Sequence, residues 1–141
     1  MSLLVSTRGR YALRVMLCLA ESSGEGCIPL KSISEKECIS QKYLESIMAD
    51  LKEAGLVIGT QGKGGGYVLS RPASSYSIGE ILRSSEDSLA TVACLERGFD
   101  CPRAESCKTL PMWKKLDSMI TGYLDTVSLT DLLEEDSSRA I

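Results

Sequence analysis

A glycine-rich segment in the first half of the chain restricts most strongly the folds that this sequence can adopt. Residues 59–66 (GTQGKGGG) contain five glycines and lie between two β-prone runs, residues 56–58 and residues 67–69. Glycine adopts the positive φ angles that tight turns require, and β-branched and aromatic residues favour strands. The pattern therefore predicts a short β-hairpin with a glycine-rich loop.

Three helical segments are predicted before this hairpin. They span residues 8–21, 29–37 and 41–54. Only residues 38–40 separate the second from the third, and Ser40 can act as the N-cap of the third. The order helix, short helix, turn, helix and hairpin predicts a winged helix-turn-helix, so the expected fold class is mainly α with a small β-hairpin. The apolar stripe of the third helix consists of Leu44, Ile47, Met48 and Leu51.

The third helix is the candidate recognition helix. A helix that enters the major groove needs a polar, long-armed first turn and an apolar inner face. Glutamine can bind adenine, glutamate and serine can contact other base edges, and lysine and tyrosine suit phosphates. A surface helix in a bundle would look similar, but the short preceding turn and the following hairpin favour DNA binding. The predicted DNA contacts are Ser40, Gln41, Lys42, Tyr43, Glu45 and Ser46.

The hairpin loop is the second candidate DNA contact. Its glycines leave backbone N–H groups unshielded, so the loop can approach a phosphate closely, and Lys63 adds a positive charge. The spacing matches no nucleotide-binding glycine motif. A wing that contacts the DNA backbone or the minor groove is therefore favoured over a nucleotide loop or a plain turn. Arg8 and Arg10, at the start of the first helix, are expected to anchor phosphates. The predicted wing residues are Gln61, Gly62, Lys63, Gly64, Gly65, Gly66 and Tyr67.

The chain has 6 cysteines and no histidine. The missing histidine excludes catalytic groups that use histidine and zinc sites with histidine ligands. The sequence also shows no nucleophile–base pair and no paired carboxylates that would indicate an enzyme. Cys94, Cys101 and Cys107 lie within 14 residues of an irregular segment. Such a group suits zinc or an iron–sulfur cluster. The other three cysteines are predicted bystanders, with Cys27 at a loop edge and Cys18 and Cys38 buried as small apolar side chains.

The second half of the chain contains a predicted dimerisation helix. Residues 77–80 form a capping box that starts a fourth helix near Ile78. Further on, apolar residues recur at spacings of three and four, which suits a core helix or, at least equally well, a symmetric dimer helix. The expected domains are a DNA-binding domain (residues 1–75), a connecting helix with the cysteine-rich loop (76–111) and a dimerisation helix with a tail (112–141). The predicted interface residues are Trp113, Leu116, Ile120, Tyr123 and Val127.

The chain end and the charge add further expectations. Ser128 with Asp131 is predicted to open a last short helix, and residues 134–141 to fray into an acidic tail. The net charge of −3 argues against a protein that coats nucleic acid non-specifically. The apolar stretch at residues 11–20 is too short to span a bilayer, and no export cleavage site follows it. The expected location is therefore the reducing cytoplasm, without membrane association.

Several stretches of the chain match one known family, and together they cover nearly the whole chain. At these residues the sequence resembles the IscR-type family of bacterial winged-helix regulators, which also includes NsrR and CymR. The resemblance implies a homodimeric transcription factor that binds palindromic double-stranded DNA. The matching stretches are residues 6–12 (STRGRYA), 39–40, 43–45, 51–57 (LKEAGLV), 62–67, 77–81 and 113–132.

The same resemblance implies a cofactor. In the cluster-binding branches of the family three cysteines hold an iron–sulfur cluster, a role that falls here on Cys94, Cys101 and Cys107, with 2Fe–2S favoured over 4Fe–4S. The CymR branch lacks this trio. The IscR pattern has a histidine where this chain has Leu110, and the NsrR pattern can use an acidic residue near a position that here is Arg10. The fourth ligand is therefore unknown; the candidates are Glu96, Asp100, Glu105 and a residue of the partner subunit.

The resemblance implies a regulator, expected to be a repressor, whose DNA affinity depends on a cluster that senses iron supply, oxygen or nitric oxide. Iron–sulfur assembly genes are its first expected targets. One alternative is a regulator of the nitric-oxide response or of cysteine metabolism within the same family. The other is an interaction module that holds zinc in its cysteine loop and docks a protein partner.

Overall fold

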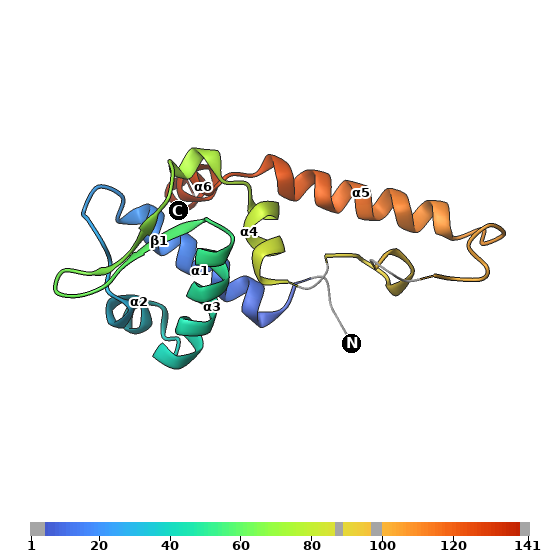
Figure 1. Cartoon of the computed structure of the whole chain (residues 1–141). Coiled ribbons are helices and arrows are strands. Elements are labelled where there is room, and N and C mark those ends of the chain that lie inside the picture. The colour runs from blue at the N-terminus through green and yellow to red at the C-terminus, as the bar shows by residue number, and fades with distance from the viewer. Residues whose placement is uncertain (1–4, 87–88, 97–99, 139–141) are drawn as a thin grey trace.

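The computed structural model describes residues 5–86, 89–96 and 100–138, and it is mostly helical (Figure 1). Its two strands pair as one antiparallel hairpin, as the sequence predicts. The helices are α1 (Thr7–Glu21), α2 (Leu30–Glu37), α3 (Gln41–Glu53), α4 (Ile78–Ser85), α5 (Leu110–Thr126) and α6 (Leu129–Ser138), with short 3₁₀ turns η1 (Ala73–Ser75) and η2 (Ala93–Leu95). The strands are β1 (Val57–Thr60) and β2 (Gly66–Leu69).

One hydrophobic core joins α1, α3, α4 and α6. The predicted apolar stripe of α3 is buried in full. Ile78 and Ile81 of α4 and Leu129 of α6 are buried in the same core. The core that supports α3 therefore draws on residues well beyond position 75.

The hairpin is longer than its β-prone runs indicate. β1 extends to Thr60, and β2 begins at Gly66, so both strands run into the glycine-rich segment. The register pairs Gly59 with Tyr67, whose ring covers that glycine. Ile28 adds a further bridge, because its N–H and C=O each bond to the backbone of Tyr67 at 2.9 Å. These contacts anchor one side of the hairpin to the body of the protein.

Serine side chains cap three helices at their N-termini. Ser6, Ser40 and Ser77 accept hydrogen bonds from backbone N–H groups in the first turns of α1, α3 and α4. These bonds satisfy donors that a helix start would otherwise leave unpaired. The predicted starts of α3 and α4 are thereby confirmed. Pro29, predicted as the first residue of the second helix, lies one position before it as the N-cap of α2.

The last helix is longer than predicted. Ser128 and Asp131 cap it reciprocally, each side chain accepting from the other residue's N–H at 3.0 and 2.9 Å. With Leu129 buried behind this cap, the helix continues to Ser138. The expected fraying from residue 134 is therefore wrong as far as Ser138, and residues 139–141 lie outside the described residues.

α5 extends away from the core to one side of the molecule (Figure 1). None of its residues is fully buried. At its C-terminal end Asp125 forms an ion pair with Arg83 at 2.8 Å, and Leu124 and Val127 pack against the core. Within the described ranges, no helix has both the length and the apolar character needed to cross a membrane.

Candidate DNA interface, dimer face and cysteine segment

The outer face of α3 carries the polar residues predicted for the recognition helix. Gln41, Lys42, Glu45 and Ser46 are exposed, while the apolar stripe of the same helix is buried. The turn before α3 is short because Cys38 adopts the left-handed conformation, with φ of 58°, and so ends α2 abruptly. This arrangement gives a supported helix whose first turns present hydrogen-bonding groups outward.

Arg8 fixes α1 to α3. Its Nε donates to Asp50 Oδ2 at 2.9 Å, and its Nη2 donates to Asp50 Oδ2 at 2.5 Å and to the backbone oxygen of Ser46 at 2.9 Å. The same Nη2 also reaches Ser46 Oγ at 2.8 Å. Arg8, predicted as a phosphate anchor, thus has partners inside the protein that set the position of α3. The sequence pattern of α3 gave no sign of the role of Asp50.

Tyr43 and Arg10 differ in how available they are to a partner. Tyr43 is half-buried, with its ring edge-to-face against Tyr11 at 5.8 Å between centroids and with the Arg8 guanidinium 5.9 Å from its ring. Arg10 is exposed, and its Nη2 donates to Thr7 Oγ1 at 3.1 Å. Of the two predicted arginines, Arg10 therefore lies more open to an approaching phosphate.

The wing tip is exposed and the wing base is packed. Gln61, Gly62, Lys63 and Gly64 are exposed at the tip, where the Gly65 N–H closes a turn onto the Gly62 carbonyl at 2.9 Å. At the base, Gly65, Gly66 and Tyr67 are half-buried. The predicted wing residues therefore divide into a contact group at the tip and a structural group at the base.

The start of α1 has a second partner that sequence reasoning missed. Glu86, which follows α4, accepts hydrogen bonds from Ser6 N at 2.7 Å and from Ser6 Oγ at 2.8 Å. Gly9 lies so close to this carboxylate that a β-carbon there would collide with it. A negative charge at a helix N-terminus is favourable, because the unpaired N–H groups make that end positive. No spacing rule could have linked two residues 80 positions apart.

The exposed apolar side chains of α5 form one stripe. Met112, Leu116, Met119 and Tyr123 are spaced by four, three and four residues, and they lie on one face of the helix. Leu116 is 40% exposed and Tyr123 is 68% exposed. Of the predicted interface residues, Leu116 and Tyr123 belong to this stripe. Trp113 and Ile120 are half-buried on an adjacent face, and Val127 is half-buried just after the end of the helix.

The three clustered cysteines lie in the segment between α4 and α5. Cys94 is exposed in η2, Cys101 and Cys107 are half-buried, and all are free thiols. The pKa of Cys107 is lowered, chiefly by a hydrogen bond with the Thr109 side chain and next by the backbone N–H groups of Thr109 and Leu110. In the parts of the chain that the structure describes, no three histidine, cysteine or acidic side chains are gathered closely enough to hold a metal ion. The donors suit a soft metal centre by type, but their described placement does not assemble one.

The remaining cysteines do not all follow the sequence prediction. Cys18 is buried within α1, as expected, and burial raises the pKa of its thiol. Cys27 is half-buried, with Sγ 3.7 Å from Thr60 Oγ1 beside β1. Cys38, expected to be buried, is exposed instead. Its left-handed backbone at the end of α2 turns the chain toward α3 and leaves its side chain at the surface.

The chain is similar to known transcriptional regulators over most of its length. The profile of the Rrf2 family, described as iron-dependent transcriptional regulators, matches residues 5–135. The HTH-type transcriptional regulator IscR of Escherichia coli K12 is 36% identical over 129 residues, which cover 92% of this chain and 79% of that protein.

Two solved structures share the fold. IscR of T. potens has a TM-score of 0.76 and 36% identity, and the match covers 97% of this chain and 90% of that one. CymR, the global cysteine regulator of B. subtilis, has a TM-score of 0.76 and 34% identity over 93% and 96% of the two chains. These relatives are regulators and not enzymes. The family match over residues 5–135, the 36% identity to IscR and the shared winged-helix fold together establish that this chain belongs to the Rrf2 family of helix-turn-helix transcriptional regulators.

Proposed function

We propose that this chain acts as a homodimer that binds a two-fold symmetric operator through α3 and the wing, with an iron–sulfur cluster on Cys94, Cys101 and Cys107 that adjusts its DNA affinity. The polar face of α3 carries the proposal, because Gln41, Lys42 and Glu45 are exposed on a helix whose other face is held in the core. The wing tip adds Lys63 and unshielded backbone N–H groups.

The proposal of a dimer is supported by the stripe on α5. Four large apolar side chains in one line on a helix that extends from the core cost free energy in water, and a second copy of the same face would cover them. Parallel or antiparallel pairing of two such helices creates a two-fold axis. Two copies of α3 could then occupy successive major grooves of a palindromic site.

The cofactor proposal is supported by the family match and by the chemistry of the three thiols. Cysteine thiolates are the usual ligands of iron–sulfur clusters, and the lowered pKa of Cys107 favours the thiolate form. A bound cluster would supply a centre that responds to iron supply, oxygen or nitric oxide. A 2Fe–2S cluster, control of iron–sulfur assembly genes and a repressor role are parts of the same proposal.

The DNA-binding half is tested with a duplex selected from a random-sequence pool by the wild-type protein. Lys63→Ala should weaken binding severalfold and reduce the slope of log affinity against log salt by about two per dimer, because each wing loses one phosphate contact. Lys114→Ala removes the same charge from the side of α5 away from the stripe, and its slope should equal that of wild type. If the pool yields no enriched duplex, the DNA-binding half fails.

The cluster half is tested by anaerobic reconstitution with iron and sulfide. Wild-type protein should gain visible absorbance with stoichiometric iron and sulfide, and Ala at Cys94, Cys101 and Cys107 together should remove both. Cys27→Ala, a half-buried cysteine outside this segment, should retain them. Colourless wild-type protein whose DNA affinity is unchanged by the triple substitution would refute cluster sensing, and stoichiometric zinc in its place would support the zinc-bound interaction module.

The likeness to CymR favours a second candidate, the regulation of cysteine metabolism. The B. subtilis CymR structure matches this chain as well as the T. potens IscR structure does, with a TM-score of 0.76 for each. In a deletion strain, this candidate predicts altered transcription of cysteine uptake and synthesis genes. The cluster proposal predicts altered transcription of iron–sulfur assembly genes.

A further inference from the structure

We propose that Tyr76 is a positioning residue that fixes the wing relative to the junction between α5 and α6. The inference rests on the proposed function, because it concerns how a dimer built on α5 presents its two wings to DNA. Tyr76 is 1% exposed and lies between η1 and α4.

The phenol hydroxyl of Tyr76 joins the two ends of the hairpin. It donates to the Leu56 carbonyl at 2.7 Å, and it accepts from the backbone N–H groups of Ser70 at 3.0 Å and Arg71 at 3.2 Å. Leu56 precedes β1, and Ser70 follows β2. Ser70 N also bonds directly to the Leu56 carbonyl at 3.4 Å, so the hydroxyl reinforces a long backbone bond where the registered strand pairs end.

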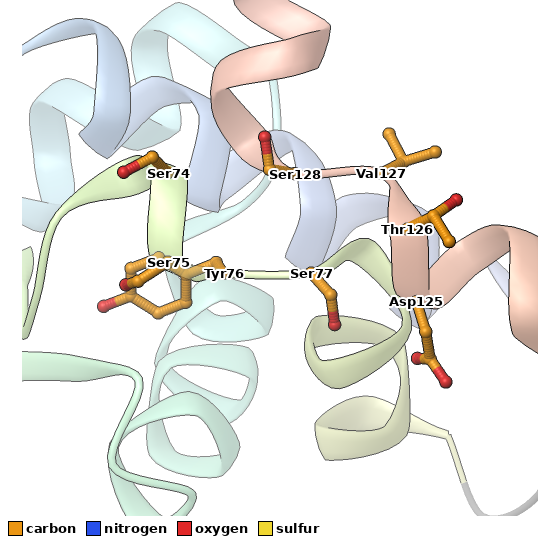
Figure 2. A pocket seen from close by; sticks show the side chains of 8 residues that line it. All are labelled: Ser74, Ser75, Tyr76, Ser77, Asp125, Thr126, Val127 and Ser128. Atoms are coloured by element: carbon orange, nitrogen blue, oxygen red, sulfur yellow. The ribbon is translucent and has the colours of Figure 1, made fainter.

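The backbone of Tyr76 joins the same point to the end of α5. Its carbonyl accepts from Leu129 N at 3.3 Å, and the neighbouring Ile78 N donates to the Val127 carbonyl at 2.8 Å. Ser77 and Ser128 form an isolated antiparallel bridge between these bonds. Figure 2 shows Tyr76 and Ser77 alongside Val127 and Ser128, where they line an open pocket of about 200 Å³.

Arg71 covers the ring of Tyr76 and ties the end of β2 to α4. Its guanidinium lies 4.2 Å from the ring centroid, and its Nη2 forms an ion pair with Glu80 at 2.5 Å. Tyr76 is therefore held by its ring, its hydroxyl and its backbone at once. Since α5 leads directly into this junction, Tyr76 links the base of the wing to the end of α5, while the Ile28 bridge holds the other side of the hairpin.

Removal of the hydroxyl separates this positioning role from core packing. In Tyr76→Phe the ring stays in place, but the Leu56 carbonyl and the N–H groups of Ser70 and Arg71 lose their shared partner, and the long 3.4 Å bond between Ser70 N and the Leu56 carbonyl is the direct link that stays. A buried group that loses its hydrogen-bond partner pulls its segment toward water or toward another partner. The base of the hairpin should then loosen while α3, held by the apolar core and by Arg8, keeps its position.

The test uses the full-length protein and the duplex selected by wild type. We expect Tyr76→Phe to weaken binding about tenfold and to reduce the salt slope by about two per dimer, the same reduction as for Lys63→Ala. Tyr76→Phe combined with Lys63→Ala should reduce the slope no further, because both remove the same contact. The amides of Ser70 and Arg71 should exchange hydrogen faster, while those of α3 stay protected.

Tyr11→Phe is the matched control, since the Tyr11 hydroxyl forms no hydrogen bond to the described residues. For this variant the slope of log affinity against log salt should equal that of wild type. If Tyr76→Phe is poorly folded, Ser70→Ala should show the same slope reduction in weaker form, because it removes the contact of Ser70 Oγ with the phenol oxygen at 3.0 Å and its hydrogen bond to the Gly55 carbonyl at 2.7 Å. A wild-type slope in a folded Tyr76→Phe, or additive slopes in the double variant, would overturn the inference. A wild-type protein that selects no duplex refutes the proposed function, and that result appears before any variant is made.

Discussion

Replacing Gly66 with alanine should detach the wing from the body of the protein. Gly66 has φ of 147°, and a β-carbon there would lie 2.7 Å from the Pro29 nitrogen and closer still to the Ile28 carbonyl. The colliding atoms are backbone, so no side chain can move aside. The collision breaks the pair of bonds between Ile28 and Tyr67. Each bond contributes about 1 kcal/mol, and an alanine held in this sparsely populated backbone region adds about 1–3 kcal/mol. The expected loss of unfolding free energy is about 3–5 kcal/mol.

Gly64 offers a matched control for this substitution. It also has a positive φ, 77°, but nothing lies within 4 Å of the position that its β-carbon would take. Gly64→Ala should therefore cost only the strain of the left-handed backbone, about 1–2 kcal/mol. Urea denaturation of both variants measures the difference. Equal losses for the two variants would show that the approach of Ile28 to Gly66 contributes nothing to stability.

Replacing Leu116 with aspartate should convert the proposed dimer to a monomer and weaken operator binding about 100-fold or more. The substitution places a charge at the middle of the apolar stripe on α5, where a second copy would have to bury it. Once the two copies separate, each binds its half-site without the gain in effective concentration that the dimer provides, which is about 10²–10⁴-fold. The free monomer should keep its stability, because Leu116 is already 40% exposed.

Ser118→Asp adds the same charge on another face of α5 and should leave the dimer intact. Sedimentation equilibrium gives the mass of each variant, and a gel shift on the selected duplex gives its affinity. Thermal unfolding of Leu116→Asp at low protein concentration checks that the monomer is folded. A Leu116→Asp protein that remains a dimer with unchanged affinity would show that this stripe is not the interface.

Local sequence patterns predicted the elements of the DNA-binding unit well. The stripe of α3 and the serine caps of α3 and α4 follow from interactions within a few residues, which spacing reveals directly. The sequence predicts a shorter hairpin than the structure has, because glycines that weaken a strand by propensity can still pair when a ring such as that of Tyr67 covers them. Propensity describes the residue alone and omits this tertiary contact.

The long-range partners of the site could not be predicted. Arg8 and Asp50 are 42 positions apart, and Ser6 and Glu86 are 80 apart, so no local rule joins them. The apolar spacing on α5 predicts an interface that includes Trp113, Ile120 and Val127, but the structure leaves these three half-buried and exposes Met112 beside Leu116 and Tyr123. Spacing predicts which residues share a side of the helix, but the neighbours of α5 determine which of them its own chain covers. The DNA contacts and the cluster ligands remain predictions.

The burial of Leu129 in the same core as α1 and α4 has a consequence for biosynthesis. The core of the DNA-binding unit is complete only after the chain has passed through α5 and returned, so a nascent chain that ends before residue 129 lacks part of that core. Contacts between residues so far apart in sequence form late, because closing a long loop costs chain entropy. The protein should therefore acquire its DNA-binding shape only after Leu129 has been translated, when the surface of α5 is also available to a second chain.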